Sequence, residues 1–160
     1  MAGFLFMKTV KIDGLIFFEF LDMDLIQEKE LESGGYCGLE IGEEGWNRIM
    51  AKASKFKASI IEAHSHPFSK KGVSFSGYDL EGFKELVPQL WWRLGGVPYM
   101  ALVFGRKDFD AIVWVDSPHV HRRLKHIVTD DGKILKPTNM TAVYLDKRNS
   151  QWKRRGTHDI

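Results

Sequence analysis

The 160-residue chain is poor in cysteine and in long hydrophobic runs, and each shortage excludes a class of protein. Its single cysteine, Cys37, cannot form a disulfide within the chain, so no internal disulfide staples the fold. The longest apolar runs, such as "LIFF" and "MALVF", are far shorter than the roughly 20 residues that cross a bilayer. No segment resembles a signal peptide. We therefore expect a cytoplasmic protein without a membrane partner.

A strong charge of one sign is also missing. The chain has 23 basic and 21 acidic residues and a formal net charge of +2, so composition gives no reason to expect nucleic acid as a partner. The basic excess is local, in "DKRNSQWKRRG" near the end. With 44% hydrophobic residues, the chain can bury the core of one domain. We expect that domain over residues 1–146, followed by a frayed basic tail over 147–160.

Hydrophobic periodicity and turn residues predict a mixed α/β (α+β) architecture, a mixed sheet with flanking helices. A hairpin over about 3–26 reverses at Asp13-Gly14, and "QEKELESGG" has the composition of an exposed loop before a short strand at 36–41. An amphipathic helix is expected over 43–56. "ASIIEAHSH" is predicted to be a strand that ends at Pro67.

The second half of the chain continues in the same way. Ser76 is a good N-cap for a second helix, in which Pro88 predicts a break or a kink. The runs "VPYMALVFG" and "FDAIVWVD" predict two further strands joined by a short turn, and "DDGKIL" predicts a last hairpin turn.

The stretch "AHSHPFSKKGVSFSGYD" has the side chains of a metal site. In an extended strand His64 and His66 project to the same side, about 6 to 7 Å apart. Asp79 lies on the first turn of the next helix, three residues after Ser76, and can become a third ligand if the loop folds back. Two histidines and one carboxylate are the ligands of a catalytic zinc site, which keeps a fourth position for water. Ser76 could hydrogen-bond that water or a developing oxyanion.

Each element has a simpler interpretation when taken alone. His64 and His66 can be ordinary strand residues, and Ser-x-x-Asp is also a helix-capping pattern. A second pair, His119 and His121, is followed by the basic "RRLKH", which discourages a cation, so we expect no metal there. It is the combined pattern from His64 to Asp79 that favours Zn²⁺.

"HSHP" followed by "SGYD" resembles the signature of the JAMM, or MPN-plus (JAB), metalloproteases: His-x-His-Pro, a loop, then Ser-x-x-Asp. The resemblance covers about residues 3–116 and implies a cytidine-deaminase-like JAB/MPN fold. It also implies that His64, His66 and Asp79 are zinc ligands and that Ser76 assists the oxyanion. The nine residues between His66 and Ser76 make this loop longer than is usual in the family, which costs little.

The resemblance also implies a general-base glutamate just before the first apolar strand, which in this chain begins at Met1. One explanation is that the natural protein starts further upstream, so that this chain lacks the base. A second is that Glu62 serves, because it shares a strand face with both histidines. A third is Glu19, an acid on an otherwise apolar strand face, where a carboxyl pKa can rise.

Three functions follow from these alternatives. The resemblance implies a zinc isopeptidase or peptidase, deubiquitinase-like, that cuts after the C-terminal tail of a ubiquitin-like protein. In a bacterial or archaeal cell it would imply E1-like and E2-like partners. The second function is a catalytically silent scaffold or binding module for the same tail. The third is hydrolysis of a small-molecule amide by the same site. The sequence leaves the oligomeric state open.

Overall fold

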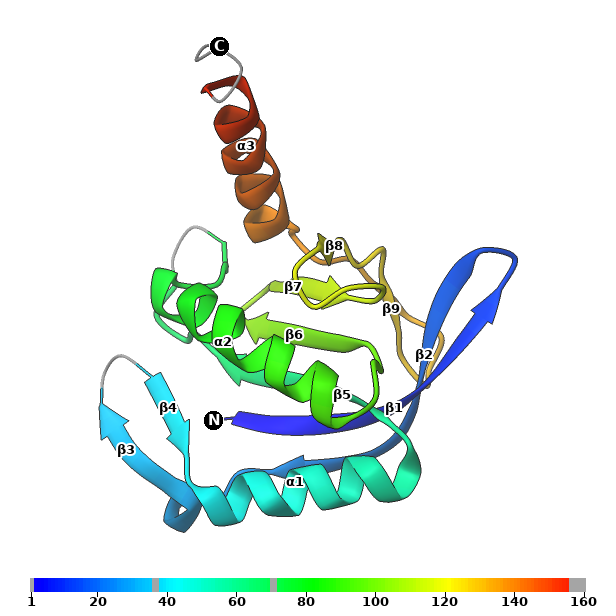
Figure 1. Cartoon of the computed structure of the whole chain (residues 1–160), viewed down its shortest axis with the longest axis vertical. Coiled ribbons are helices and arrows are strands. Elements are labelled where there is room, and N and C mark those ends of the chain that lie inside the picture. The colour runs from blue at the N-terminus through cyan, green and yellow to red at the C-terminus, as the bar shows by residue number, and fades with distance from the viewer. Residues whose placement is uncertain (1, 36–37, 70–71, 156–160) are drawn as a thin grey trace.

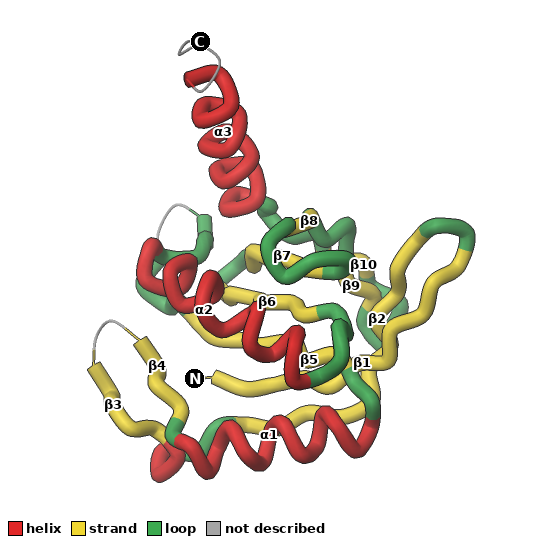
Figure 2. The backbone as a smooth tube through the Cα atoms, viewed as in Figure 1, coloured by secondary structure: helices red, strands yellow, loops and turns green. Residues whose placement is uncertain are grey.

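The computed structural model describes residues 2–35, 38–69 and 72–155. It has the mixed α/β architecture that the sequence predicts: one six-stranded sheet, two small two-stranded sheets and three α-helices (Figures 1 and 2). The elements run β1 Ala2–Ile12, β2 Leu15–Leu25, 3₁₀ helix η1 Glu28–Glu30, β3 Leu31–Gly35, β4 Gly38–Ile41, α1 Glu43–Phe56, β5 Ser59–Ser65, α2 Gly77–Arg93, β6 Tyr99–Phe104, β7 Phe109–Trp114, β8 His121–Arg122, β9 Ile127–Val128, β10 Ile134–Leu135 and α3 Met140–Arg155.

The six-stranded sheet has the order β2-β1-β5-β6-β7-β8, and only the pairing of β5 with β6 is parallel. The predicted hairpin is confirmed, with Asp13 (φ 49°) and Gly14 (φ 75°) in the left-handed conformation that a tight Asp-Gly turn needs. β5, which carries the histidine motif, lies between β1 and β6 at the centre of the sheet. Backbone pairing on both sides therefore fixes the strand that matters most for the site.

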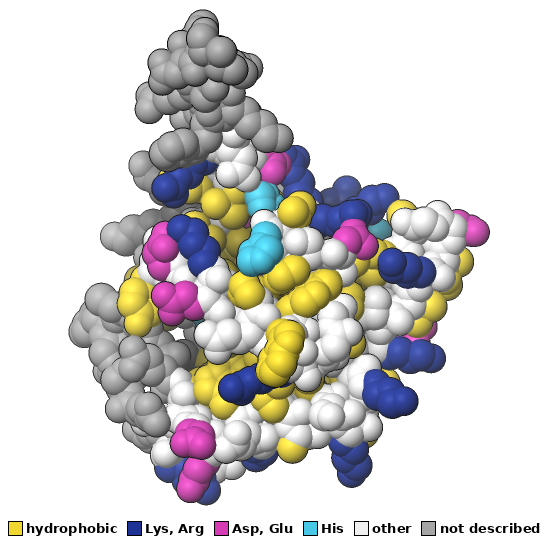
Figure 3. Space-filling model, in the orientation of Figure 1, with side chains coloured by type: hydrophobic (Ala, Val, Ile, Leu, Met, Phe, Trp, Pro, Cys, Tyr) yellow, Lys and Arg dark blue, Asp and Glu magenta, His cyan; other side chains and the backbone are white. Residues whose placement is uncertain are grey.

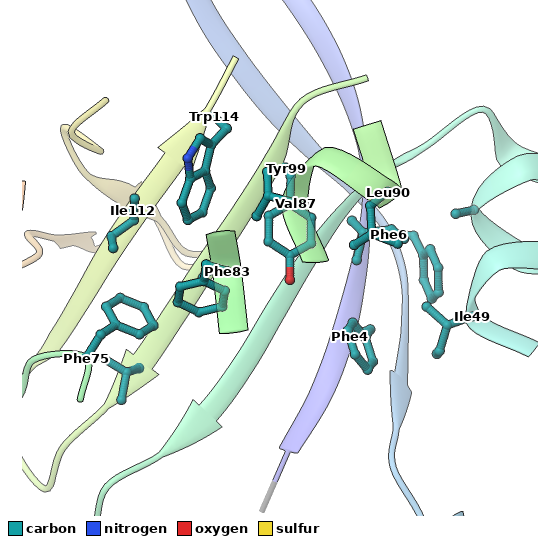
Figure 4. Close-up of a cluster of buried hydrophobic side chains, with 14 of the residues drawn as sticks. Phe4, Phe6, Ile49, Phe75, Phe83, Val87, Leu90, Tyr99, Ile112 and Trp114 are labelled. Carbon is teal, nitrogen blue, oxygen red and sulfur yellow. The ribbon is translucent and has the colours of Figure 1, made fainter. Parts of the chain in front are cut away.

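The main core fills the space between the sheet and the helices α1 and α2 (Figure 4). Phe4 and Phe6 from β1 meet Ile49 of α1, and Phe83 of α2 packs edge-on against Trp114 of β7. A second cluster on the opposite face of the sheet includes Ile61, and the segment that holds β9 and β10 packs against it. None of the helices in the described ranges is long and apolar enough to cross a membrane.

Several predicted elements are confirmed. The helix over 43–56, the strand at β5, the two strands β6 and β7, and a hairpin at the "DDGKIL" turn are all present. Of the strand predicted at 36–41, β4 confirms the part from Gly38 onward, whereas positions 36 and 37, including Cys37, lie outside the described residues.

Three predictions were wrong. The segment predicted to be an exposed loop at 27–35 contains η1 and β3, because β3 finds a partner in β4. The break that was one of the two outcomes predicted at Pro88 does not occur, since Phe83, Val87 and Leu90 bury the inner face of α2 and outweigh the lost hydrogen bond. The expected fraying from 147 onward is replaced by α3, which continues to Arg155. The expected boundary at 146 therefore falls inside a helix, and residues 156–160 lie outside the described part.

Candidate metal centre

The two histidines are held at the carboxyl end of the central strand. In β5, His64 lies directly opposite Ala2 of β1 on one side and Val103 of β6 on the other. His66 follows the strand, and its backbone N–H donates to the Phe104 carbonyl (2.8 Å). The imidazole rings lie 5.0 Å apart between their centroids. The predicted projection of both side chains to one side is confirmed.

The N-terminus of α2 supplies the carboxylate. Ser76 caps the helix, and the Asp79 N–H donates to Ser76 Oγ (3.1 Å). In return, Asp79 Oδ2 accepts from the backbone N–H and from the hydroxyl of Ser76, both at 2.7 Å. This capping box fixes the Asp79 carboxylate and leaves Oδ1 without a bond from Ser76. The capping interpretation and the metal-ligand interpretation are therefore compatible.

The three candidate ligands converge. One ligand atom from each of His64, His66 and Asp79 lies within 4.8 Å of the others. His64 Nε2 is 3.6 Å from Asp79 Oδ1, and His66 Nε2 is 3.7 Å from Asp79 Oδ2. Ligand atoms at ~2.0–2.1 Å from a tetrahedral Zn²⁺ stand roughly 3.3–3.5 Å apart. The two nitrogen-to-oxygen distances, each to a different oxygen of Asp79, are a few tenths of an ångström longer than that value.

A polar atom without a partner points to the same place. His64 Nε2 is buried and has no hydrogen-bond partner among the described residues, since 3.6 Å to Asp79 is too long for a hydrogen bond. Buried polar atoms are rarely left unsatisfied, so this nitrogen calls for a ligand. A cation between His64, His66 and Asp79 would satisfy it. The donor set fits a metal ion such as zinc.

Glu62 lies on the other side of the His64 ring. Its Oε1 is 3.6 Å from His64 Nδ1, and its Oε2 accepts a hydrogen bond from the buried Tyr99 hydroxyl (2.7 Å). A carboxylate beside the nitrogen that does not face the metal can orient the ring by accepting its N–H, which here needs a closer approach than 3.6 Å. Glu62 therefore has the position of an orienting residue and not of a base beside the ligand atoms. Nothing in the sequence near Tyr99 signals this contact, because it joins two neighbouring strands.

Burial and neighbouring charges shift two pKa values in the metal-free site. Burial alone would lower the pKa of His64, but the carboxylates of Asp79 and Glu62 outweigh it and raise this pKa to about 9. Burial would raise the pKa of Asp79, but His64 and the hydrogen bonds from Ser76 lower it to about 2. The metal-free centre therefore holds a protonated His64 beside an ionised Asp79 at neutral pH.

This protonation predicts a pH-dependent metal affinity. A histidine must be neutral to bind a metal, so the bound ion replaces the His64 proton, and the apparent zinc affinity should rise about tenfold between pH 7 and pH 8 and level off near pH 9. Calorimetry at pH 7.5 in buffers of different ionisation enthalpy should find about one proton released per zinc bound. An affinity that does not change over this range would contradict the assigned His64 pKa.

The loop between the two ligand segments is held by contacts that the sequence did not predict. Its second half buries Val73 and Phe75, and the Phe75 ring lies 5.8 Å from that of His64. The Phe75 N–H donates to Thr141 Oγ1 of α3, and Thr141 in turn donates to the fully buried Asp110 of β7. These bonds fix the backbone just before Ser76.

A cavity of about 410 Å³ opens beside the first half of the same loop, which directly follows His66. Arg106 contributes to it and donates through Nε to the Pro67 carbonyl (2.8 Å). Asp108 in the same lining partly offsets the charges of Arg106 and Lys107. The cavity is lined by Phe68, Ser69, Gly72, Arg106, Lys107 and Asp108.

Glu19 and His121 both lie away from the metal centre. Glu19 pairs with Lys8, six positions along β1 from Ala2, which lies opposite His64, so the separation is about 20 Å. The structure therefore does not bring Glu19 to the histidines, which corrects its suggested role as a base. His121 Nε2 lies 3.0 Å from Asp146, and among the described residues the cluster at His64 is the one with three converging ligands.

No protein-family model matches this sequence, and no protein of curated function is similar enough to count as a relative. A function for this chain therefore rests on the geometry of the metal centre and on the motif resemblance.

Proposed function

We propose that this chain is a zinc-dependent hydrolase of the JAMM/MPN-plus type that cuts an isopeptide or peptide bond. The observation that carries the proposal is the convergence of His64, His66 and Asp79 around the buried His64 Nε2, which has no hydrogen-bond partner in the described part of the chain. Two imidazoles and a carboxylate that converge on one point are the ligand types of a hydrolytic zinc centre. Their order along the chain, His-x-His-Pro and then Ser-x-x-Asp, supports the family assignment.

The position of each residue in the metal centre suggests its role. His64, His66 and Asp79 would hold the ion, and Glu62 would orient His64 through Nδ1. When bound, zinc supplies a Lewis acid that polarises a carbonyl and lowers the pKa of a water. The exposed Ser76 now donates its hydroxyl to Asp79. Turned toward a substrate, the same hydroxyl could donate to a developing oxyanion.

The substrate class rests on the resemblance. Proteins with this signature are expected to act on the C-terminal tail of a ubiquitin-like protein, with E1-like and E2-like proteins as further partners. The hollow at Arg106 and Lys107 borders the loop that follows His66 and is the surface where we expect such a substrate to bind. A small amide would need less of this surface.

A second candidate is a binding module that holds zinc and the tail without turnover. Of the described residues, Asp79 and Glu62 are the carboxylates within 4 Å of the nitrogens of His64 and His66. Asp79 is assigned as a ligand and Glu62 lies at Nδ1, so neither is placed as a general base. The lack of a placed general base among the described residues is the observation that favours the binding module without turnover.

The experiment that separates the two candidates uses a ubiquitin-like protein fused through its tail to a reporter. The zinc-loaded chain is compared with Ala2→Glu, because Ala2 lies directly opposite His64, and directly opposed residues share a face of the sheet. Cleavage by the unchanged chain supports the hydrolase. Cleavage by Ala2→Glu alone shows that the unchanged chain binds zinc correctly but lacks a general base. Tail binding without cleavage by either supports the module, and neither binding nor cleavage would contradict both.

The role of Glu62 can be tested by Glu62→Gln and Tyr99→Phe. If Glu62 orients His64, both changes lower the zinc affinity, by roughly 10- to 100-fold for Glu62→Gln and by less for Tyr99→Phe. If Glu62 were a general base, Glu62→Gln would instead lower kcat and leave the zinc affinity unchanged. Zinc titration against a competing chelator reads the first effect, and Glu81→Gln on the exposed face of α2 is the matched control.

A further inference from the structure

The outer half of the β1–β2 hairpin extends beyond the rest of the sheet (Figure 1). β1 pairs with β5 through Ala2 to Met7, whereas its pairing with β2 continues to Ile12 and Leu15. From Lys8 outward the hairpin is therefore a two-stranded ribbon. A two-stranded ribbon gains little stability by itself. Ile16 and Phe18 pack against the second core cluster, whereas the residues that alternate with them stay exposed.

This hairpin exposes more large apolar side chains than any other element. Each is between 43% and 57% exposed: Ile12, Leu15, Phe17, Phe20, Leu21, Met23 and Leu25. In Figure 3 hydrophobic side chains lie along the projecting edge of the molecule at the right of the view. Leu15, Phe17, Phe20 and Leu21 of β2 leave on the order of 400 Å² of apolar surface in solvent. A stable interface buries about 800 Å² per partner, so these side chains would supply about half of one.

The backbone of β2 is also open to pairing. β2 is the outermost strand of the sheet. At Met23 its polar groups are occupied, since the N–H donates to Asp22 Oδ1 and the carbonyl accepts from Lys52 Nζ. From Leu15 to Leu21 no described side chain covers the backbone in this way. Such an edge is a template for another strand.

The charges of β2 fit a second copy of the same strand. Asp22 and Asp24 form ion pairs with Lys52 and Arg48 of α1, which leaves Glu19 as the charged residue of the open stretch. In an antiparallel self-pairing centred on Phe18, Glu19 lies opposite Phe17 and not opposite another Glu19. The same register sets Ile16 opposite Phe20. No like charges meet at its centre.

We propose that two copies of this chain pair through β2, antiparallel and around a two-fold axis, to form one continuous sheet of twelve strands. A strand that pairs with itself gives the closed, isologous contact that most dimers use. The metal centre lies at the other end of β1, where Ala2 pairs with His64, so it stays open in the dimer. The proposal goes beyond the hydrolase function and does not depend on it.

Analytical ultracentrifugation of the full chain tests the pairing. The unchanged chain should sediment as a dimer. The double variant Phe17→Glu/Phe20→Glu should sediment as a monomer with unchanged zinc affinity, because it sets a second carboxylate opposite Glu19 of the other copy. The control Trp92→Glu replaces an aromatic of α2 that is more exposed than Phe17 or Phe20, and it should stay dimeric. A monomeric unchanged chain at about 100 μM, or a dimer that survives the double variant, would overturn the proposal.

Hydrogen exchange on the unchanged chain gives a second test that needs no variant. Backbone amides of Leu15–Leu21 should exchange more slowly as the protein concentration rises through the dimerisation range, while those at Asp130–Lys133 stay the same. Exchange at Leu15–Leu21 that does not depend on concentration would count against pairing through β2.

Discussion

Replacing His64 with alanine is expected to lower the affinity for zinc by more than ~100-fold and to abolish any hydrolytic activity. Even partners of a ligand cost roughly 10- to 100-fold when they are removed, and His64 is placed as a ligand itself. The variant also loses the buried Nε2 that calls for a cation. Competition with a chelator of known affinity measures the loss, and the thermal shift on adding zinc should disappear with it.

His121→Ala is the matched control, because His121 belongs to the second His-x-His pair and lies beside one carboxylate, that of Asp146. Its zinc affinity and activity should equal those of the unchanged chain. If His121→Ala loses zinc while His64→Ala keeps it, the metal lies at the other histidine pair and the assigned centre is wrong.

Replacing Asp110 with alanine is expected to lower the free energy of unfolding by about 3 kcal/mol. Asp110 is fully buried and accepts hydrogen bonds from the Thr141 N–H (2.9 Å), the Thr141 hydroxyl (2.6 Å) and the Ala111 N–H (2.9 Å). Alanine leaves buried donors at Thr141 without an acceptor and releases the N-terminus of α3. Because Thr141 also accepts from Phe75, the loop before Ser76 should loosen as well.

Urea unfolding followed by circular dichroism measures this loss. Asp116→Ala serves as the comparison, since Asp116 is half-exposed and pairs with Arg122 at the surface, where an ion pair contributes at most about 1 kcal/mol. Zinc affinity of Asp110→Ala should fall less than that of His64→Ala. An unfolding free energy within about 0.5 kcal/mol of the unchanged chain would show that Thr141 finds another acceptor.

Local patterns were enough to predict much of the fold. The Asp13-Gly14 pair, the helical spacing that begins at Glu43 and the cap at Ser76 each depend on a few adjacent residues, and the structure confirms them. Elements that depend on a distant partner were missed. β3 exists through β4, and α2 passes Pro88 because its apolar side chains are buried in the core.

The site divides in the same way. The convergence of His64, His66 and Asp79 follows from strand alternation and from a helix cap, so the sequence could predict it. The side of the His64 ring on which Glu62 lies could not be predicted, because it depends on the hydrogen bond from Tyr99 on the neighbouring strand. The bond from Asp110 to Thr141 joins β7 to α3 and leaves no periodic signal.

The central claim is that His64, His66 and Asp79 bind one divalent cation. Its most direct test is a zinc titration of the purified chain, with the bound metal counted by elemental analysis after unbound zinc has been removed. The account predicts one zinc per chain for the unchanged protein and none for Asp79→Ala. A chain that retains no zinc, or an Asp79→Ala variant that retains as much as the unchanged protein, would contradict it.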